Sequence, residues 1–152
     1  MMDAFYGKQS TYSTIARVRL RVYGGDTVEG VTVKLTDVKD CEELKGILPF
    51  NLRFKDDIGT PCKTSIELHP EDDQFVDVAS WKWNSASQPT IVFHAATLGD
   101  QEVPLKPYEI TLRLTGKDVR SESKKFWIGI GDEDKPELGI RKGLFSMRAL
   151  SD

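Results

Sequence analysis

The sequence contains few cysteines and few histidines. Its 152 residues include only Cys41 and Cys62, and only His69 and His94. Two thiols cannot complete a tetrahedral zinc site, and a disulfide is expected only in an oxidising compartment. A chain of this length buries enough surface to fold without either. We therefore expect two free thiols, no metal site and no cofactor.

Long apolar runs and an excess of basic residues are also missing. No stretch approaches the roughly 18 apolar residues that a membrane-spanning helix needs. The first residues, MMDAFYGKQS, lack the apolar segment of a signal peptide. The net charge is −3, from 21 basic and 24 acidic residues. We therefore expect a cytoplasmic protein that does not bind nucleic acid, although a membrane-anchored parent protein is compatible with these features.

Sequence motifs of common enzymes are absent. There is no G-x-S-x-G nucleophile elbow and no Walker A loop, and Gly129-Ile130-Gly131 leads into acidic residues that repel phosphate. His69 precedes a proline in an expected turn, and His94 lies on the polar side of an expected strand. We interpret both as surface or packed histidines, so an enzyme is not expected.

The strongest pattern in the sequence is alternation of apolar and polar residues with a period of two. Ala16, Val18 and Leu20, for example, alternate with arginines. Side chains of a strand point alternately to opposite faces, so this pattern predicts strands with one buried face. The expected strands cover residues 16–22, 31–36, 50–55, 66–68, 76–81, 91–95, 108–115 and 125–130.

These segments predict an all-β fold, an antiparallel β-sandwich of about seven to eight strands. One-sided alternation favours antiparallel sheets, because parallel sheets are usually covered on both faces. One short helix is expected at residues 40–48, capped by Asp40. The expected sandwich covers residues 12–131, with an N-terminal extension at 1–11 and a C-terminal tail at 132–152.

Two segments resemble immunoglobulin-like modules. Residues 68–78, LHPEDDQFVDV, resemble a turn between neighbouring strands, and residues 105–112, LKPYEITL, resemble the start of a late strand whose tyrosine anchors a corner. Over residues 12–131 the chain resembles a loose group of uncharacterised bacterial immunoglobulin-like sandwich domains, some of which sit beside membrane helices. The resemblance implies an immunoglobulin-like sandwich with a binding or scaffolding role and no catalytic residues.

Three tryptophans are the first candidates for a binding surface. On a strand Trp81 and Trp83 share a face about 7 Å apart, suited to stacking on a sugar or anchoring a protein. Trp127 falls on the polar side of its strand. The plainer interpretation is that Trp81 closes the core edge and Trp83 covers it.

A row of arginines, Arg17, Arg19 and Arg21, is the second candidate surface. It suits an acidic partner, whereas the plainer interpretation is cross-strand pairing with Glu109 or similar residues. Acidic segments at 56–57, 71–73 and 132–134 suit calcium if they converge, but solvated turn carboxylates are the simpler interpretation.

The leading hypothesis is a non-catalytic domain that binds another protein through Trp81, Trp83 and Trp127, with the arginine row second. One alternative is a carbohydrate-binding module that uses an aromatic platform. The other is a small hydrolase on a β-sandwich, which requires His69 or His94 beside a carboxylate in a cleft.

Overall fold

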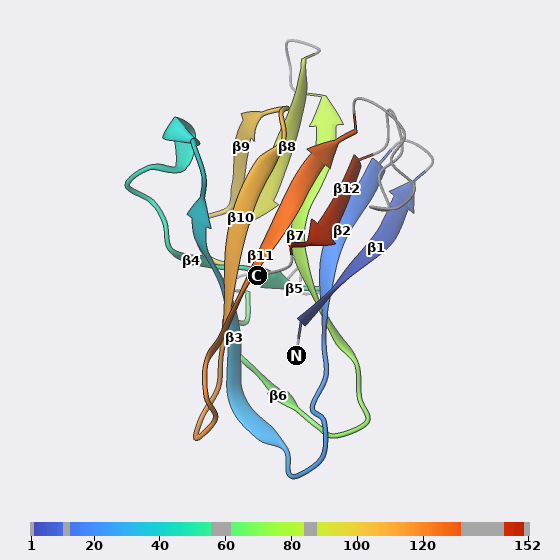
Figure 1. Ribbon diagram of the computed structural model, residues 1–152, viewed down its shortest axis with the longest axis vertical. Helices are drawn as coiled ribbons and strands as arrows, with labels where there is room; N and C mark the ends of the chain where they lie inside the picture. Colours follow the sequence, from blue (N-terminus) through green and yellow to red (C-terminus); the bar gives the residue numbers. More distant parts are fainter. Residues whose placement is uncertain (1, 11–12, 56–61, 84–87, 132–144, 151–152) are drawn as a thin grey trace.

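The computed structural model describes residues 2–10, 13–55, 62–83, 88–131 and 145–150, and nearly all of its regular structure is β-strand. The strands form two antiparallel sheets, each with six strands in the described part of the chain. The first sheet has the order β1-β2-β7-β8-β9, and β5 also pairs with β7 (Figure 1). Its strands are β1 (Met2–Ser10), β2 (Ser13–Leu20), β5 (Arg53–Phe54), β7 (Gln74–Trp83), β8 (Pro89–His94) and β9 (Asp100–Pro104).

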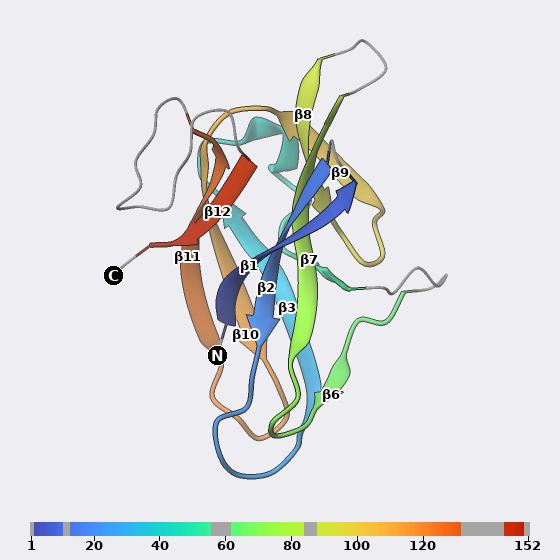
Figure 2. The same cartoon turned by 90° about the vertical axis from the view of Figure 1, so that its right-hand side faces the viewer.

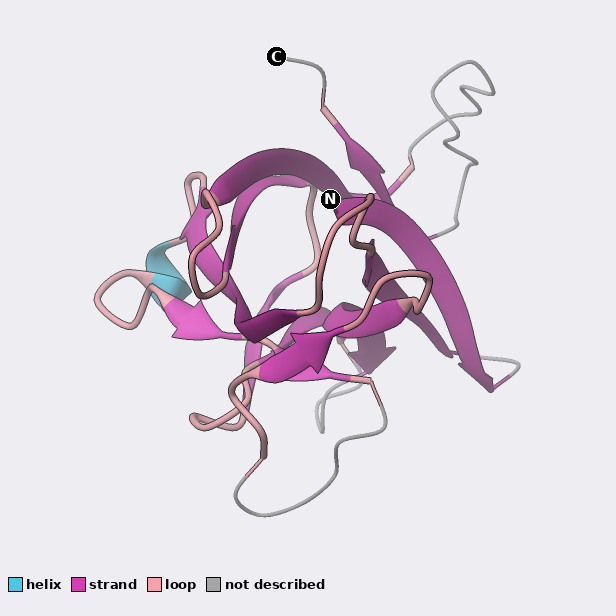
Figure 3. Ribbon diagram, turned by 90° about the horizontal axis from the view of Figure 1, so that it is seen from below, coloured by secondary structure: helices cyan, strands magenta, loops and turns pink. Residues whose placement is uncertain are grey.

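The second sheet has the order β12-β11-β10-β3-β4, and β6 also pairs with β3. Its strands are β3 (Val28–Val38), β4 (Phe50–Asn51), β6 (Ile66–Leu68), β10 (Tyr108–Thr115), β11 (Glu122–Ile130) and β12 (Phe145–Ala149). The two sheets pack face to face around one core, as Figure 3 shows along the strands. The predicted antiparallel β-sandwich is therefore confirmed.

Alternation decides which side chains enter the core. Val18 and Leu20 of β2 are fully buried in it, whereas Arg17 and Arg19 point to the other face of the first sheet. In the second sheet, Leu112 lies in the core opposite Leu35. Within the described residues, no helix is long and apolar enough to cross a bilayer.

The sandwich extends beyond the expected boundaries at both ends. Residues 2–10, expected in an extension, form β1 and pair with β2 from Met2–Leu20 to Ser10–Ser13. Residues 145–149, expected in a tail, form β12 and pair with β11. Edge strands bond to a neighbour on one side only, and the sequence of β1 lacks clear alternation, so the periodic pattern did not reveal it.

The expected helix at residues 40–48 is a single 3-10 turn, η1 (Glu42–Leu44). Asp40 has a φ of 57°, in the left-handed region. A helix cap requires an extended backbone, so Asp40 cannot serve as one. Cys41 occupies the cap position without a capping hydrogen bond from its side chain, and Leu44 buries its side chain in the core.

A tyrosine fixes the connection that carries the chain from β9 in the first sheet to β10 in the second. The Tyr108 hydroxyl donates a 2.7 Å hydrogen bond to the carbonyl of Pro104, as expected for a corner tyrosine. Gly129 on β11 lies against the same connection, because a Cβ there would be 2.9 Å from Cα of Pro107. The crossing between the sheets is thus held by the hydrogen bond of Tyr108, by a 3.3 Å hydrogen bond from Nζ of Lys106 to the carbonyl of Asp40, and by the close approach of Gly129.

Candidate functional site

The arginine row lies on the outer face of the first sheet, where neighbouring carboxylates neutralise it. Nε of Arg17 is 2.7 Å from Oδ1 of Asp77, and the Arg21 guanidinium donates to both carboxylate oxygens of Asp73. The hydrogen bond from Arg21 is the main cause that lowers the pKa of Asp73, and the charge of Arg19 lowers it further. Glu109, considered as a partner for this row, lies instead on β10 of the other sheet.

A buried polar network extends from this row across the outer face of the first sheet. Asp77 is 3% exposed and lies within ion-pair distance of Arg17 on β2 and of Arg53 on β5, at 2.7 and 3.6 Å. Nη2 of Arg53 is 3.3 Å from Nδ1 of His94 on β8. Sequence reasoning missed Asp77, although a carboxylate inside the apolar segment FVDV was a visible signal of a buried charge.

A serine, a histidine and an aspartate are aligned at the other side of this network. Oγ of Ser80 is 3.0 Å from Nε2 of His94, and Nδ1 of His94 is 3.1 Å from Oδ1 of Asp100. These distances are those of a nucleophile, a base and a group that orients the base. Burial is the main cause that lowers the pKa of His94, so its imidazole is neutral at pH 7.

The surroundings of Ser80 are those of a packed sheet. Its side chain is 7% exposed, and its backbone lies between Ile15 of β2 and Val92 of β8. An acyl-transfer site needs backbone N–H groups free to bind the developing oxyanion, whereas the ladder of a central strand uses them. The geometry therefore supports a structural role for Ser80, His94 and Asp100, linking β7, β8 and β9.

The three candidate tryptophans do not share one surface. Trp81 is half-buried and packs against the core between the sheets, whereas Trp127 lies on β11 of the other sheet. The backbone of Trp83 pairs with Pro89, and its side chain lies outside the described part of the structure. Strand β7 has a bulge at Val78, because Asp77 pairs with Arg17 and Ala79 pairs with Ala16, which leaves Val78 without a partner on β2. Beyond this bulge, the positions of β7 whose side chains point to the core are shifted by one residue.

Trp127 instead lies on the outer face of the second sheet, among polar and basic side chains. Glu109 and Arg148 lie directly opposite it on the two neighbouring strands, and the Arg148 guanidinium is 5.9 Å from the centre of its ring. Alternation along β3, β10, β11 and β12 places a larger set of polar residues on this face. We call it the Trp127 face: Thr32, Lys34, Asp37, Glu109, Thr111, Arg113, Thr115, Ser123, Lys125, Trp127, Ser146 and Arg148.

The cations of this face are only partly neutralised. Lys125 lies 3.8 Å from Glu109. Lys34 and Arg113 are direct cross-strand neighbours, and among the described residues neither pairs with a carboxylate. Arg113 donates a 3.1 Å hydrogen bond to the hydroxyl of Ser121. Like charges placed opposite each other destabilise a sheet, so this pair is an electrostatic cost within the isolated domain.

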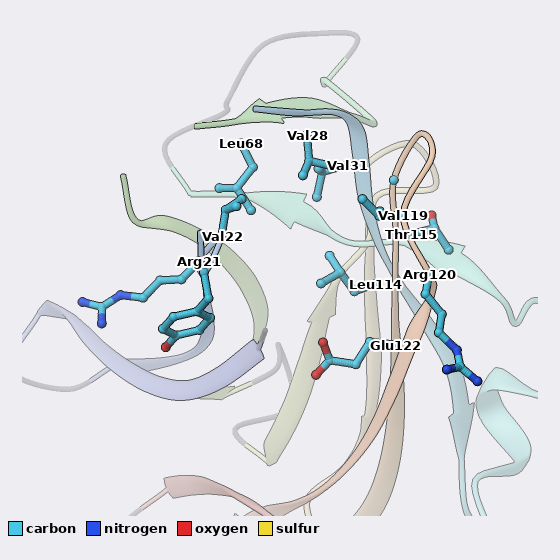
Figure 4. A pocket seen from close by; sticks show the side chains of 12 residues that line it. Arg21, Val22, Val28, Val31, Leu68, Leu114, Thr115, Val119, Arg120 and Glu122 are labelled. Carbon is cyan, nitrogen blue, oxygen red and sulfur yellow. The ribbon is translucent and has the colours of Figure 1, made fainter. Parts of the chain in front are cut away.

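A separate cavity of about 360 Å³ opens at the end of the sandwich where β3 begins and β10 ends. Its walls are mostly apolar, and Figure 4 shows Val22, Val31, Leu68 and Leu114 around a common space. We call it the end cavity, and it is lined by Arg21, Val22, Tyr23, Val28, Val31, Leu68, Leu114, Thr115, Gly116, Val119, Arg120 and Glu122. Sequence reasoning did not predict it, because it forms between strands distant in the chain.

The remaining sequence candidates are separate from these sites. His69 is exposed, with Nδ1 2.9 Å from Oγ1 of Thr27, and it lies apart from the network of His94. No disulfide joins Cys41 and Cys62. Within the described residues no three His, Cys, Asp or Glu side chains cluster to hold a metal ion. The acidic segments 56–57 and 132–134 lie outside the described residues, so convergence with 71–73 stays a prediction.

No protein-family model matches the chain, and no curated protein or solved structure is significantly similar to it. The resemblance to bacterial immunoglobulin-like domains therefore stays a prediction based on the motifs at residues 68–78 and 105–112.

Proposed function

We propose that the protein is a non-catalytic interaction domain that binds an acidic segment of another protein through the Trp127 face. The observation that carries this proposal is the cross-strand pair of Lys34 and Arg113, which has no carboxylate partner in the part of the chain that the structure describes. A partner carboxylate placed between them would relieve their repulsion and form charge-assisted hydrogen bonds with both. The repulsion between the two cations destabilises the sheet of the free domain, and binding of the partner carboxylate would remove this repulsion.

Trp127 and Arg148 support the same proposal. Tryptophan and arginine are the side chains most often found at the energetic centres of protein interfaces. Their cation–π contact holds two flat groups in place before a partner arrives, which reduces the entropy lost on binding. The nearby pair of Lys125 and Glu109 is exposed and supplies a polar rim.

Binding of a labelled acidic probe tests this proposal directly. We would measure the fluorescence anisotropy of fluorescein-labelled poly-glutamate with the wild type and with the variant Lys34→Ser/Arg113→Ser. The expected result is binding that weakens as salt rises, and a loss of about fivefold to thirtyfold in affinity for the variant, since two exposed ion pairs of about 0.5–1 kcal/mol each contribute about 1–2 kcal/mol together.

A matched control separates a specific face from net charge. Lys45→Ser/Lys117→Ser removes the same charge from exposed positions that pair with Glu42 and Glu29. The proposal requires this control to bind the probe nearly as well as the wild type. Equal losses in both double variants would refute the Trp127 face, and tight binding to anionic vesicles without binding to the peptide would indicate a membrane surface instead.

A cytoplasmic location belongs to the same proposal. Cys41 is buried beside a carboxylate, 3.5 Å from Oε2 of Glu43, and its burial raises the pKa of its thiol. A protonated, buried thiol with no disulfide suits a reducing compartment. The carbohydrate alternative has less support, because Trp81 faces the core and does not present its ring as an open platform.

The hydrolase is a second candidate, favoured by the alignment of Ser80, His94 and Asp100. Its test is labelling by a fluorophosphonate probe, which reacts with activated serines. Labelling of the wild type that is lost in Ser80→Ala would establish a reactive serine. No labelling after long incubation would leave these residues as the sheet cross-link that their burial indicates.

A further inference from the structure

The end cavity has the composition of a small-molecule site. Val31 and Leu68, which are 2% and 3% exposed, line it together with Leu114. Its volume of about 360 Å³ lies at the small end of the range of about 300–1,000 Å³ for ligand pockets. Apolar walls with a few polar groups at the rim are typical of such sites.

The mouth of the end cavity leaves apolar surface in water. Tyr23 is 61% exposed and Val119 is 48% exposed, and both line the opening. Gly116 brings the chain close to one wall, because a Cβ there would lie 2.8 Å from Cγ1 of Val28 and 3.0 Å from Cγ2 of Val119. An apolar ligand that covered Tyr23 and Val119 would therefore remove exposed hydrocarbon from water.

Three charged side chains, Arg21, Arg120 and Glu122, line the mouth of the end cavity. Arg21 is already paired with Asp73, and Glu122 is also engaged in an interaction. Arg120 has no such partner among the described residues, so it is the charge at the mouth that is left to pair with a ligand. Figure 4 shows the guanidinium groups of Arg21 and Arg120 directed away from the apolar side chains. The cavity is thus apolar inside, with an available cation outside.

We propose that the end cavity binds a small amphipathic carboxylate, an apolar chain of medium length that ends in one negative charge. The chain lies among Val22, Val31, Leu68 and Leu114, and the carboxylate lies outside the cavity against Arg120. The end cavity adjoins the Trp127 face at the hydrogen-bonded pair of Thr32 and Thr115, but its apolar walls are not part of that face, and this proposal does not depend on the function proposed for that face.

The test uses sodium octanoate as the probe and nuclear magnetic resonance of the ¹⁵N,¹³C-labelled full chain as the readout. We expect saturable shifts in the methyl groups of Val22, Val31, Leu68 and Leu114, with a dissociation constant in the millimolar range, as the efficiency of small ligands allows. Octanol should bind without the contribution of Arg120, and octylammonium should bind more weakly than octanoate.

Two variants and a control make the test specific. Arg120→Ala should weaken octanoate by about threefold to fivefold, the effect of one exposed ion pair, and leave octanol unchanged. Val22→Phe, at the half-buried rim, should block both ligands while the dispersed amide spectrum shows that the protein is folded. Lys117→Ala, in the same hairpin and paired with Glu29, should leave octanoate binding unchanged.

Three results would overturn the proposal. The first is an absence of saturable methyl shifts at about 20 mM octanoate, well above the expected dissociation constant. The second is binding of octylammonium as tight as that of octanoate. The third is an equal loss in Arg120→Ala and Lys117→Ala, which would mean that only the overall charge matters.

Discussion

Replacing Asp77 with asparagine removes the negative charge that Arg17 and Arg53 share on the first sheet. The side chains of Asp77, Arg17 and Arg53 are 5%, 12% and 23% exposed. Losing one partner of a buried ion pair costs about 3–5 kcal/mol, and losing one of an exposed pair costs about 0–1 kcal/mol. The arginines keep some contact with water, and asparagine still accepts a hydrogen bond from Arg17. We therefore expect Asp77→Asn to lower the free energy of unfolding by about 2 kcal/mol.

Urea unfolding followed by tryptophan fluorescence measures this loss, and thermal unfolding should show a melting temperature lower by about 4–8 °C. Asp73→Asn is the matched control. The pair of Asp73 and Arg21 also links the chain at β2 to the chain at β7, but the side chains of Arg21 and Asp73 are 40% and 32% exposed. The control should lose less stability, and its loss should shrink in 1 M salt. Two results would refute the reasoning. One is a loss in the free energy of unfolding below about 0.5 kcal/mol in Asp77→Asn, which is the usual effect of a surface substitution. The other is an equal loss in both variants.

Three further predictions concern other buried groups. Burial lowers the pKa of His94, so the unfolded chain binds a proton on this histidine at a higher pH than the folded protein does. The free energy of unfolding of the wild type should therefore fall as pH drops below about 6.5. The variant His94→Gln should show a smaller fall in the urea midpoint between about pH 7 and 5. Tyr108→Phe should cost about 1–1.5 kcal/mol in urea unfolding through loss of the hydrogen bond to Pro104, and an unchanged midpoint would contradict this role. Gly129→Ala should cost about 1–3 kcal/mol by calorimetry, because its Cβ meets the Pro107 backbone; a neutral result would show that this contact yields easily.

The sequence predicted the fold class because most strands bury one face. Val18 and Leu20 alternate with arginines, and the structure places the two sets on opposite faces of β2. The resemblance at residues 105–112 also suggested a corner tyrosine, and Tyr108 makes such a hydrogen bond to Pro104 although it directly follows a proline. Local patterns of this kind depend only on neighbours in the chain.

Features set by distant pairing were not readable. Asp77 meets Arg17 across 60 positions, and nothing in the sequence shows that β2 and β7 are neighbours. The bulge at Val78 moves Trp81 to the core side, so counting by two from the start of β7 fails beyond that point. The end cavity and the Trp127 face depend likewise on which strands meet, and sequence periodicity does not contain that information.

The contact between β1 and β12 makes folding depend on the order of synthesis. Both strands lie at sheet edges and touch each other, and Lys124 Nζ donates a 3.0 Å hydrogen bond to the carbonyl of Met2 (Figures 1 and 2). β1 ends at residue 10 and β12 begins at residue 145, a separation of 135 residues. At about 5–20 residues per second, a ribosome needs about 7–27 s to make the chain between them. Throughout that interval β1 lacks its contact with β12, so this part of the sandwich closes only after the last strand has been made.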